Sequence, residues 1–130
     1  MAAPEVLVAD DEAVSQRLVC AMLDQAGYPF RVVEDGIEAL ELLMSDAAPP
    51  IALLDWIMPR LDGIEVIRRL REQSQAAQPY VILLTSRRSP HDIVAGLKAG
   101  ADDYITKPPH LEELVARVSV GARVVGCSGR

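Results

Sequence analysis

The segment from Ile51 to Leu54 is a run of apolar or small residues that leads directly into the carboxylate of Asp55. An apolar run of this length is typical of a strand buried on both faces, as found in parallel sheets. Asp55 would then lie at the carboxyl end of a central strand, where open α/β sheets bind their ligands. Because an ionised group in such a place is costly unless it is paired, we expect the rest of the chain to supply partners for Asp55.

Four other short apolar runs alternate with segments that have helical periodicity or helix-capping residues. The strands are predicted at residues 6–9, 30–33, 51–54, 80–84 and 103–106. Asp35 with Glu38, and Ser89 with Pro90, form N-terminal capping patterns for the helices that follow two of these strands. Five strands that alternate with five helices predict an α/β fold, with a parallel sheet and helices on both of its faces.

For the first predicted helix the sequence predicts which face packs inward, and for the last predicted helix it predicts where the domain ends. The first helix is expected to turn inward an apolar face made of Val14, Leu18 and Met22. The last helix is expected to loosen around Gly121. We therefore predict one domain over residues 1–120, followed over residues 121–130 by a C-terminal tail or the start of a linker to an output domain.

The length and charge of the chain argue against several functional classes. The sequence has 130 residues, enough for one domain with its own core, and a formal net charge of -6, which argues against direct binding of nucleic acid. No apolar stretch approaches ~18 residues, so no membrane span is predicted. The N-terminus lacks the features of a secretory signal, and two cysteines are too few for a disulfide scaffold. A reducing cytoplasm is the expected location.

Polar residues follow four of the five predicted strands at the point where each strand ends. The carboxyl ends of parallel strands meet at one edge of a sheet, so these side chains are expected to lie close together. In chain order they are Asp10 and Asp11, then Asp55, then Thr85 and Ser86, then Lys107. Taken alone, Asp10 and Asp11 could cap a helix, and Asp55 could simply pair with a lysine. The ordered set on four strand ends is the specific signal.

The chemistry of these residues fits phosphoryl transfer to a carboxylate. Neighbouring carboxylates raise one another's pKa, and a hard divalent cation such as Mg2+ relieves this through oxygen ligands. Asp55 can then act as the nucleophile toward a phosphoryl donor. Lys107 can bind one phosphoryl oxygen as a point charge. Thr85 Oγ and the backbone N–H of Ser86 can donate to another.

On these residues the sequence resembles the response-regulator receiver domain of two-component signalling, and the chemotaxis regulators in particular. The resemblance extends from about Glu5 to Val120. The motifs that carry it are Asp10-Asp11, Asp55 with Met58-Pro59 and Asp62-Gly63, Thr85-Ser86, Gly100-Ala101-Asp102-Asp103-Tyr104, and Lys107-Pro108. The resemblance implies a flavodoxin-like doubly wound sheet with the strand order 2-1-3-4-5. It also implies a cis peptide bond between Lys107 and Pro108.

The resemblance further implies a phosphorylation-dependent signalling switch. Asp55 would accept a phosphoryl group from a phosphohistidine of a sensor histidine kinase or a histidine phosphotransfer protein. The implied ligands of Mg2+ are Asp10, Asp11, Asp55 and the backbone carbonyl of Ile57. Such a domain catalyses only its own phosphoryl transfer and dephosphorylation, and it is not an enzyme in the usual sense.

The resemblance assigns the transmission of the signal to Thr85 and Tyr104. In this scheme the Thr85 hydroxyl moves toward the phosphoryl group and the Tyr104 ring swings into the vacated space. The surface formed by the fourth helix, the fifth strand and the fifth helix is then recognised by an attached output domain or a partner protein. A phosphorylation-linked dimer is compatible with this scheme.

Two other functions are compatible with parts of the sequence. A pseudo-receiver would keep the fold and act as a docking module without phosphorylation. Its support is Ile57, which is often polar in relatives, and the departure of Pro109 and His110 from the commonest pattern. An Asp-nucleophile phosphohydrolase would tend to carry a second Asp two residues after the nucleophile, where this chain has Ile57.

Overall fold

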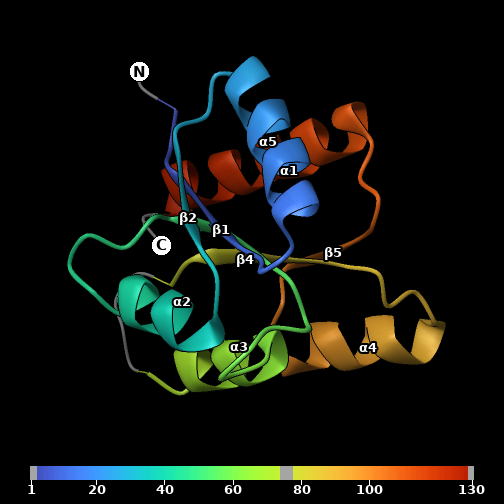
Figure 1. Ribbon diagram of the computed structural model, residues 1–130. Helices are drawn as coiled ribbons and strands as arrows, with labels where there is room; N and C mark the ends of the chain where they lie inside the picture. The colour runs from blue at the N-terminus through green and yellow to red at the C-terminus, as the bar shows by residue number, and fades with distance from the viewer. Residues whose placement is uncertain (1–2, 74–77, 129–130) are drawn as a thin grey trace.

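The computed structural model describes residues 3–73 and 78–128, and it contains the predicted alternation of strands and helices (Figure 1). The strands are β1 (Val6–Ala9), β2 (Phe30–Val33), β3 (Ile51–Leu54), β4 (Tyr80–Thr85) and β5 (Asp103–Thr106). The helices are α1 (Ala13–Gln25), α2 (Gly36–Leu43), α3 (Gly63–Arg71), α4 (Pro90–Ala99) and α5 (Leu111–Ser128). Four strands have the predicted bounds, and β4 is one residue longer than predicted. In the described part of the chain, no helix is both long and apolar enough to cross a membrane.

All the strands pair in parallel in the order β2-β1-β3-β4-β5, which confirms the predicted flavodoxin-like doubly wound sheet. Ala9 on β1 is in register with Leu54 on β3. The backbone N–H of Asp55 donates to the Ala9 carbonyl oxygen at 3.0 Å. Asp10 and Asp55 therefore leave the sheet at the same level, on neighbouring strands.

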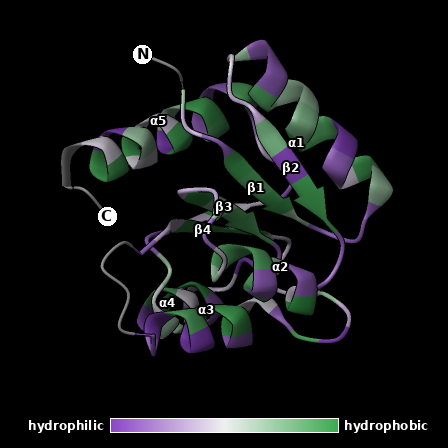
Figure 2. Cartoon of the chain, turned by 90° about the vertical axis from the view of Figure 1, so that its left-hand side faces the viewer, coloured by the Kyte–Doolittle hydropathy of each residue, from purple (hydrophilic) through white to green (hydrophobic). Residues whose placement is uncertain are grey.

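Helices α1 and α5 cover one face of the sheet, and helices α2, α3 and α4 cover the other (Figure 1). Successive strand residues point to opposite faces, so Leu53 and Ile82 join the core on the α1–α5 side. Their neighbours Leu54 and Leu83 join the core on the α2–α4 side. Figure 2 shows the central strands in green, between helices that carry bands of purple polar residues. The continuous apolar strands are therefore explained by burial on both faces.

Side-chain caps determine where three of the helices begin. The N-cap residues of α2, α3 and α4 are Asp35, Asp62 and Ser89 respectively. The side chain of each accepts a hydrogen bond from the backbone N–H of the residue three positions later in the chain. The distances are 2.8, 2.9 and 3.1 Å respectively. The predicted caps at Asp35 and Ser89 are thus confirmed, and Pro90 occupies the start of α4 as predicted.

The prediction for the inward face of α1 is wrong. Val14 is 72% exposed and Leu18 is 40% exposed, whereas Val19 and Leu23 are buried against the sheet. Met22 packs at the margin of this core. Apolar residues surround much of α1, so its periodicity alone does not select one face. The packing against β1 selects the Val19–Leu23 stripe and leaves Val14 and Leu18 at the surface.

The expectation that α5 loosens around Gly121 is also wrong, because the helix continues to Ser128. A Cβ atom at position 121 would lie 2.6 Å from Cδ1 of Tyr80, so the glycine lets α5 approach the ring of Tyr80 closely. Val124 and Val125 are half-buried against the same core. The domain boundary at residue 120 stays a prediction, and residues 129–130 lie outside the described part.

The close approach of α5 to Tyr80 can be tested with two identical substitutions in one helix. Gly121→Ala should lower the free energy of unfolding by about 1–2 kcal/mol, because overlap with the buried ring outweighs the helix-propensity gain of alanine. Gly126→Ala meets no atom within 4 Å and should be neutral or stabilising. Urea denaturation of both variants measures the difference. Equal stabilities would contradict the packing of α5 described here.

Candidate functional site

Lys107 joins two buried carboxylates at the carboxyl edge of the sheet. Its Nζ atom lies 2.8 Å from Asp10 Oδ2 and 2.8 Å from Asp55 Oδ2. The backbone N–H of Lys107 donates to the Thr85 carbonyl oxygen at 2.9 Å, which continues the pairing of β4 and β5 toward this edge. The exposed fractions of the Lys107, Asp10 and Asp55 side chains are 12%, 5% and 8%. The structure thus brings together predicted site residues from three strand ends.

Further hydrogen bonds hold the two carboxylates in place. Asp10 Oδ1 accepts the backbone N–H of Glu12 at 2.9 Å, and Asp10 Oδ2 accepts the Ser15 hydroxyl at 2.6 Å. Asp55 Oδ1 accepts the backbone N–H of Ile57 at 3.3 Å. The Asp10 carboxylate is therefore anchored by the start of α1, whereas the Asp55 carboxylate is held by its own loop and by the lysine.

The acidic surroundings keep Lys107 in its protonated form. Burial alone disfavours the ammonium, but hydrogen bonds and charge from Asp10 and Asp55 outweigh it, so the pKa of Lys107 lies well above its ordinary value. A raised lysine pKa contributes stability that is fully present below the unfolded pKa of about 10.4 and is lost as pH rises through the folded pKa. At neutral pH Lys107 is therefore a cationic donor and not a base.

A cavity of about 340 Å³ opens at this edge of the sheet, and we call it the acceptor cavity. The residues that line it are Asp11, Glu12, Asp55, Ile57, Ser86 and Lys107. Asp11 and Ser86 have exposed side chains. The structure therefore places both of these predicted site residues at the same cavity as Asp55 and Lys107.

The donor atoms near the acceptor cavity suit a hard cation in kind, but their present arrangement does not form a complete site. Mg2+ prefers carboxylate and carbonyl oxygens, and the candidates here are Asp10, Asp11, Asp55 and the Ile57 carbonyl. Among the described residues, no three acidic, histidine or cysteine side chains converge on a point that could hold a metal ion. Lys107 instead bridges Asp10 and Asp55. The donor set fits Mg2+ in kind, through the Oδ1 atoms of Asp10 and Asp55 that Lys107 does not contact.

The predicted switch residues are linked through the backbone of Arg87. The Thr85 side chain is fully buried, and its Oγ1 accepts the Arg87 N–H at 3.4 Å. The Tyr104 hydroxyl donates to the Arg87 carbonyl oxygen at 2.8 Å, and the tyrosine is buried. Burial, followed by the charge of Asp92, raises the pKa of Tyr104, so its hydroxyl stays a donor at neutral pH. The hydrogen bonds of both predicted switch residues therefore depend on the position of one residue in the β4–α4 loop.

The Arg87 side chain flanks the site and lies over the ring of Trp56, a contact that the sequence does not predict. Its Cζ atom lies 4.8 Å from the ring centroid of Trp56, the residue after Asp55. Its Nη1 atom lies 3.6 Å from Asp92 Oδ1 in the first turn of α4. An arginine pair after a strand is usually solvated, and only the fold shows that one of them stacks on a tryptophan. Arg87 thereby connects the loop after β3 to the start of α4.

The loop that follows Asp55 is held by close contacts with its surroundings. A Cβ atom at position 63 would lie 2.3 Å from the Asp55 carbonyl oxygen, so Gly63 allows α3 to begin directly against the site. Arg60, with a φ of 71°, places its guanidinium 3.1 Å from Asp35. The hydrogen bond from the backbone N–H of Glu38 lowers the pKa of Asp35. Burial acts in the opposite direction, and the charge of Arg60 lowers the pKa further. The loop is therefore tied to the N-terminus of α2.

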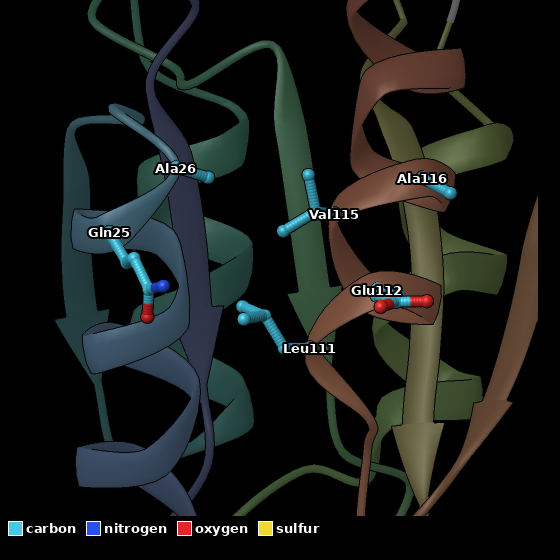
Figure 3. Close-up of a pocket in the computed structure, with 6 residues that line it drawn as sticks. All are labelled: Gln25, Ala26, Leu111, Glu112, Val115 and Ala116. Atoms are coloured by element: carbon cyan, nitrogen blue, oxygen red, sulfur yellow. The ribbon is translucent and has the colours of Figure 1, made fainter.

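A second cavity, of about 410 Å³, lies between α1 and α5 (Figure 3). Its lining is mostly aliphatic and consists of Gln25, Ala26, Leu111, Glu112, Val115 and Ala116. None of these residues lines the acceptor cavity, and none of them is a cation that could bind a phosphoryl group. The acceptor cavity is therefore the better candidate for the chemistry.

Removal of the lysine charge should destabilise the fold. Lys107→Met leaves Asp10 and Asp55 buried without their cation, so the free energy of unfolding in EDTA should fall by about 3 kcal/mol. Adding Asp55→Asn should restore part of the loss, because one carboxylate charge is then gone. Lys98→Met, at the exposed second lysine of the chain, is the control and should change little. Thermal and urea unfolding would contradict the pairing if the two lysine variants were equally stable.

Comparison with known proteins identifies the family. The response regulator receiver domain family matches residues 6–119. Response regulator MprA of Mycobacterium ulcerans is 46% identical over 113 residues, which cover 87% of this chain and 47% of the relative. The chain thus spans about half the length of the curated relatives that it matches.

Solved structures agree with this match. The Francisella response regulator 1452 receiver domain is similar with a TM-score of 0.85 at 36% identity, over 94% of this chain and 98% of that one. A second similar structure is the receiver domain of sensor histidine kinase PA1611 from Pseudomonas aeruginosa PAO1, which has a magnesium ion coordinated in its active site cleft. Its TM-score is 0.81 at 31% identity, and the match covers 93% of this chain and 98% of that one. The chain therefore belongs to the response regulator receiver domain family, a family of phosphorylation-dependent signalling modules that are generally not conventional enzymes.

Proposed function

We propose that this receiver domain accepts a phosphoryl group on Asp55 from the phosphohistidine of a sensor histidine kinase or a histidine phosphotransfer protein. The observation that carries the proposal is the Lys107 ammonium, 2.8 Å from Asp55 Oδ2 at the acceptor cavity. One cavity therefore holds a nucleophilic carboxylate and a cation that attracts the anion to be accepted. Membership of the family implies a sensor histidine kinase as a partner.

The proposed step is a displacement at phosphorus with the Asp55 carboxylate as nucleophile. A bond forms between Asp55 Oδ and phosphorus while the P–N bond of the donor breaks, and the departing imidazole nitrogen keeps the electron pair of that bond. Lys107 offsets negative charge on one phosphoryl oxygen. Thr85 Oγ1 and the Ser86 backbone N–H donate to the others. Hydrolysis of the acyl phosphate regenerates Asp55, so the domain acts only on itself.

The proposed cofactor is Mg2+, with ligands from Asp10, Asp11, Asp55 and the Ile57 carbonyl. When bound, Mg2+ would offset the repulsion between these carboxylates and an incoming phosphoryl group. Asp11 and Asp55 already line the acceptor cavity. Lys107 contacts only the Oδ2 atoms of Asp10 and Asp55, which leaves the Oδ1 atoms of both carboxylates to the ion. The magnesium-containing Pseudomonas receiver domain supports this choice of ion.

Thr85 and Tyr104 are the proposed relay from Asp55 to the surface. Movement of the Thr85 hydroxyl toward a phosphoryl group breaks its contact with the Arg87 N–H. Tyr104 binds the carbonyl oxygen of the same residue, so displacement of Arg87 reaches the tyrosine as well. The ion pair between Arg87 and Asp92 extends the effect to the first turn of α4. These contacts support a signal that leaves through α4 and β5.

The face formed by α4, β5 and α5 is the proposed contact surface for an output domain. On α4, Val94 and Leu97 are apolar residues that are 50% and 43% exposed. The matched relatives are about twice as long as this chain, which supports an output domain joined by a linker beyond α5. A phosphorylation-linked dimer through this face is compatible with the proposal, and the reducing cytoplasm is the proposed location.

Labelling by a small phosphodonor tests the acceptor residue. Incubation with acetyl phosphate and Mg2+ should add one phosphoryl group to the wild-type chain, measured by intact mass, and Asp55→Asn should abolish the label. Asp46→Asn makes the same chemical change at an exposed loop residue and should be labelled like the wild type. Omission of Mg2+ should slow labelling strongly, because Lys107 alone then offsets the repulsion between the anionic donor and the carboxylates of the site.

Each other outcome points to another function. A wild-type chain that folds normally but takes up neither label nor Mg2+ would be a pseudo-receiver that acts as a docking module. Turnover of small phosphate esters beyond one equivalent would indicate a phosphohydrolase. Label that persists in Asp55→Asn would place the acceptor elsewhere in the chain.

The proposed contact surface for the phosphodonor protein is an apolar rim beside the acceptor cavity. The rim consists of Val14, Leu18, Pro108 and Pro109. These residues line a cavity of about 380 Å³ that shares Glu12, Ser86 and Lys107 with the acceptor cavity. A protein whose phosphohistidine reaches Asp55 must cover this rim. Val14 and Leu18, which the packing of α1 leaves at the surface, would be covered by such a partner.

A charged residue on the rim should slow phosphoryl transfer from a kinase but not phosphoryl transfer from a small molecule. Val14→Asp should slow transfer from a phosphorylated histidine kinase that labels the wild type by at least about tenfold, because a charge is buried in an apolar contact. Labelling by acetyl phosphate should change little. Val94→Asp on α4 is the control and should keep the wild-type rate from the kinase. Equal rates for both variants with the kinase would remove the rim as the contact surface.

A further inference from the structure

Lys107 contacts one carboxylate more than the proposed reaction requires. A lysine ammonium has three N–H donors. Its Nζ atom lies 2.8 Å from Asp10, 2.8 Å from Asp55 and 3.3 Å from Oε1 of Glu12. These contacts account for all three donors. A phosphoryl oxygen can therefore bind Lys107 only where one of the carboxylates has left.

Glu12 is the carboxylate that can leave most easily. Its side chain is 67% exposed, compared with 5% for Asp10 and 8% for Asp55. Its contact with Lys107 is also the longest of the three. A buried carboxylate that loses its cation is strongly destabilised, whereas an exposed carboxylate exchanges the cation for water at little cost. The exposed fractions thus rank Glu12 as the group that a phosphoryl oxygen displaces.

The Glu12 side chain has no capping task in its own helix. Glu12 is the N-cap residue of α1, but its carboxylate makes no capping hydrogen bond. Its backbone is held independently, because the N–H donates to Asp10 Oδ1 at 2.9 Å and the carbonyl accepts the Gln16 N–H at 2.9 Å. The side chain is therefore directed to Lys107 by the fixed backbone. A substitution of this side chain leaves the start of α1 intact.

Glu12 also stands where the acceptor cavity meets the rim cavity, since it lines both of them. An anionic phosphodonor that approaches Asp55 from the rim passes this carboxylate. Two like charges close together repel each other. The Glu12 carboxylate therefore opposes the entry of the donor and occupies a donor group of Lys107 at the same time.

We propose that Glu12 is a positioning residue that holds, in the unphosphorylated domain, the place on Lys107 that a phosphoryl oxygen takes during the reaction. The proposal rests on the function proposed above for Asp55. Glu12 keeps the third N–H of Lys107 paired while no donor is present. It also slows labelling by small anionic donors. Glu12 forms no covalent bond and is displaced from Lys107 when the phosphoryl group arrives.

The rate of labelling tests this role. Glu12→Gln keeps the size of the side chain and removes its charge, so the initial rate of Asp55 labelling by acetyl phosphate and Mg2+ should rise about fivefold at low ionic strength. Glu41→Gln makes the same charge change at an exposed site on α2 and should leave the rate unchanged. The gain from Glu12→Gln should shrink in high salt, where exposed charges are screened.

A second measurement observes the contact itself, without phosphorylation. Lys98 and Lys107 are the two lysines of the sequence, so a ¹⁵N spectrum of lysine ammonium groups reports Lys107 without overlap from many signals. Glu12→Gln should speed hydrogen exchange of the Lys107 ammonium and leave Lys98 unchanged. Glu41→Gln should alter neither signal. A purely structural role of Glu12 would not change the exchange at Lys107 alone.

The outcomes separate this inference from the function on which it rests. If the wild type is labelled on Asp55 but Glu12→Gln shows the rate and the ammonium exchange of Glu41→Gln, the role of Glu12 is overturned and the acceptor function stands. If the wild type is not labelled at all, the acceptor function fails and the role of Glu12 fails with it.

Discussion

The ammonium of Lys107, held between two buried carboxylates, is the interaction on which the site depends. The register of β1 with β3 places Asp10 and Asp55 on neighbouring strand ends, so the fold itself creates a repulsion that a cation has to offset. Lys107 supplies that cation from β5 with two contacts of 2.8 Å. One group therefore stabilises this edge of the sheet and takes part in the proposed reaction of Asp55.

Much of the fold could be predicted because its signals are local. The apolar run before Asp55 and the caps at Asp35 and Ser89 each specify a strand or a helix start without reference to the rest of the chain. The inward face of α1 could not be predicted, because apolar residues lie around most of that helix and the sheet decides between them. Gly121 misleads for another reason. It resembles a helix end in sequence, whereas in the structure it is a point of close contact with Tyr80.

In the candidate site, too, some features could be predicted from the sequence and others depend on packing. The order of polar residues on strand ends predicts which side chains meet, and the structure places Asp10, Asp55 and Lys107 together. The hydrogen-bond partners within the site depend on side-chain rotamers and loop paths, which no sequence spacing encodes. For this reason neither the contact of Glu12 with Lys107 nor the stacking of Arg87 could be predicted. Both arise where the loop after one strand passes the loop after another.

The link between Thr85 and Tyr104 runs through main-chain atoms, because Thr85 Oγ1 accepts the N–H of residue 87 and the Tyr104 hydroxyl donates to the carbonyl oxygen of the same residue. Every amino acid except proline supplies both of these groups. The arginine at this position adds its own contacts to Trp56 and Asp92, but the connection itself survives their exchange. A substitution at position 87 that keeps the path of the backbone would therefore change the contacts with Trp56 and Asp92 and leave the main-chain link between Thr85 and Tyr104 in place.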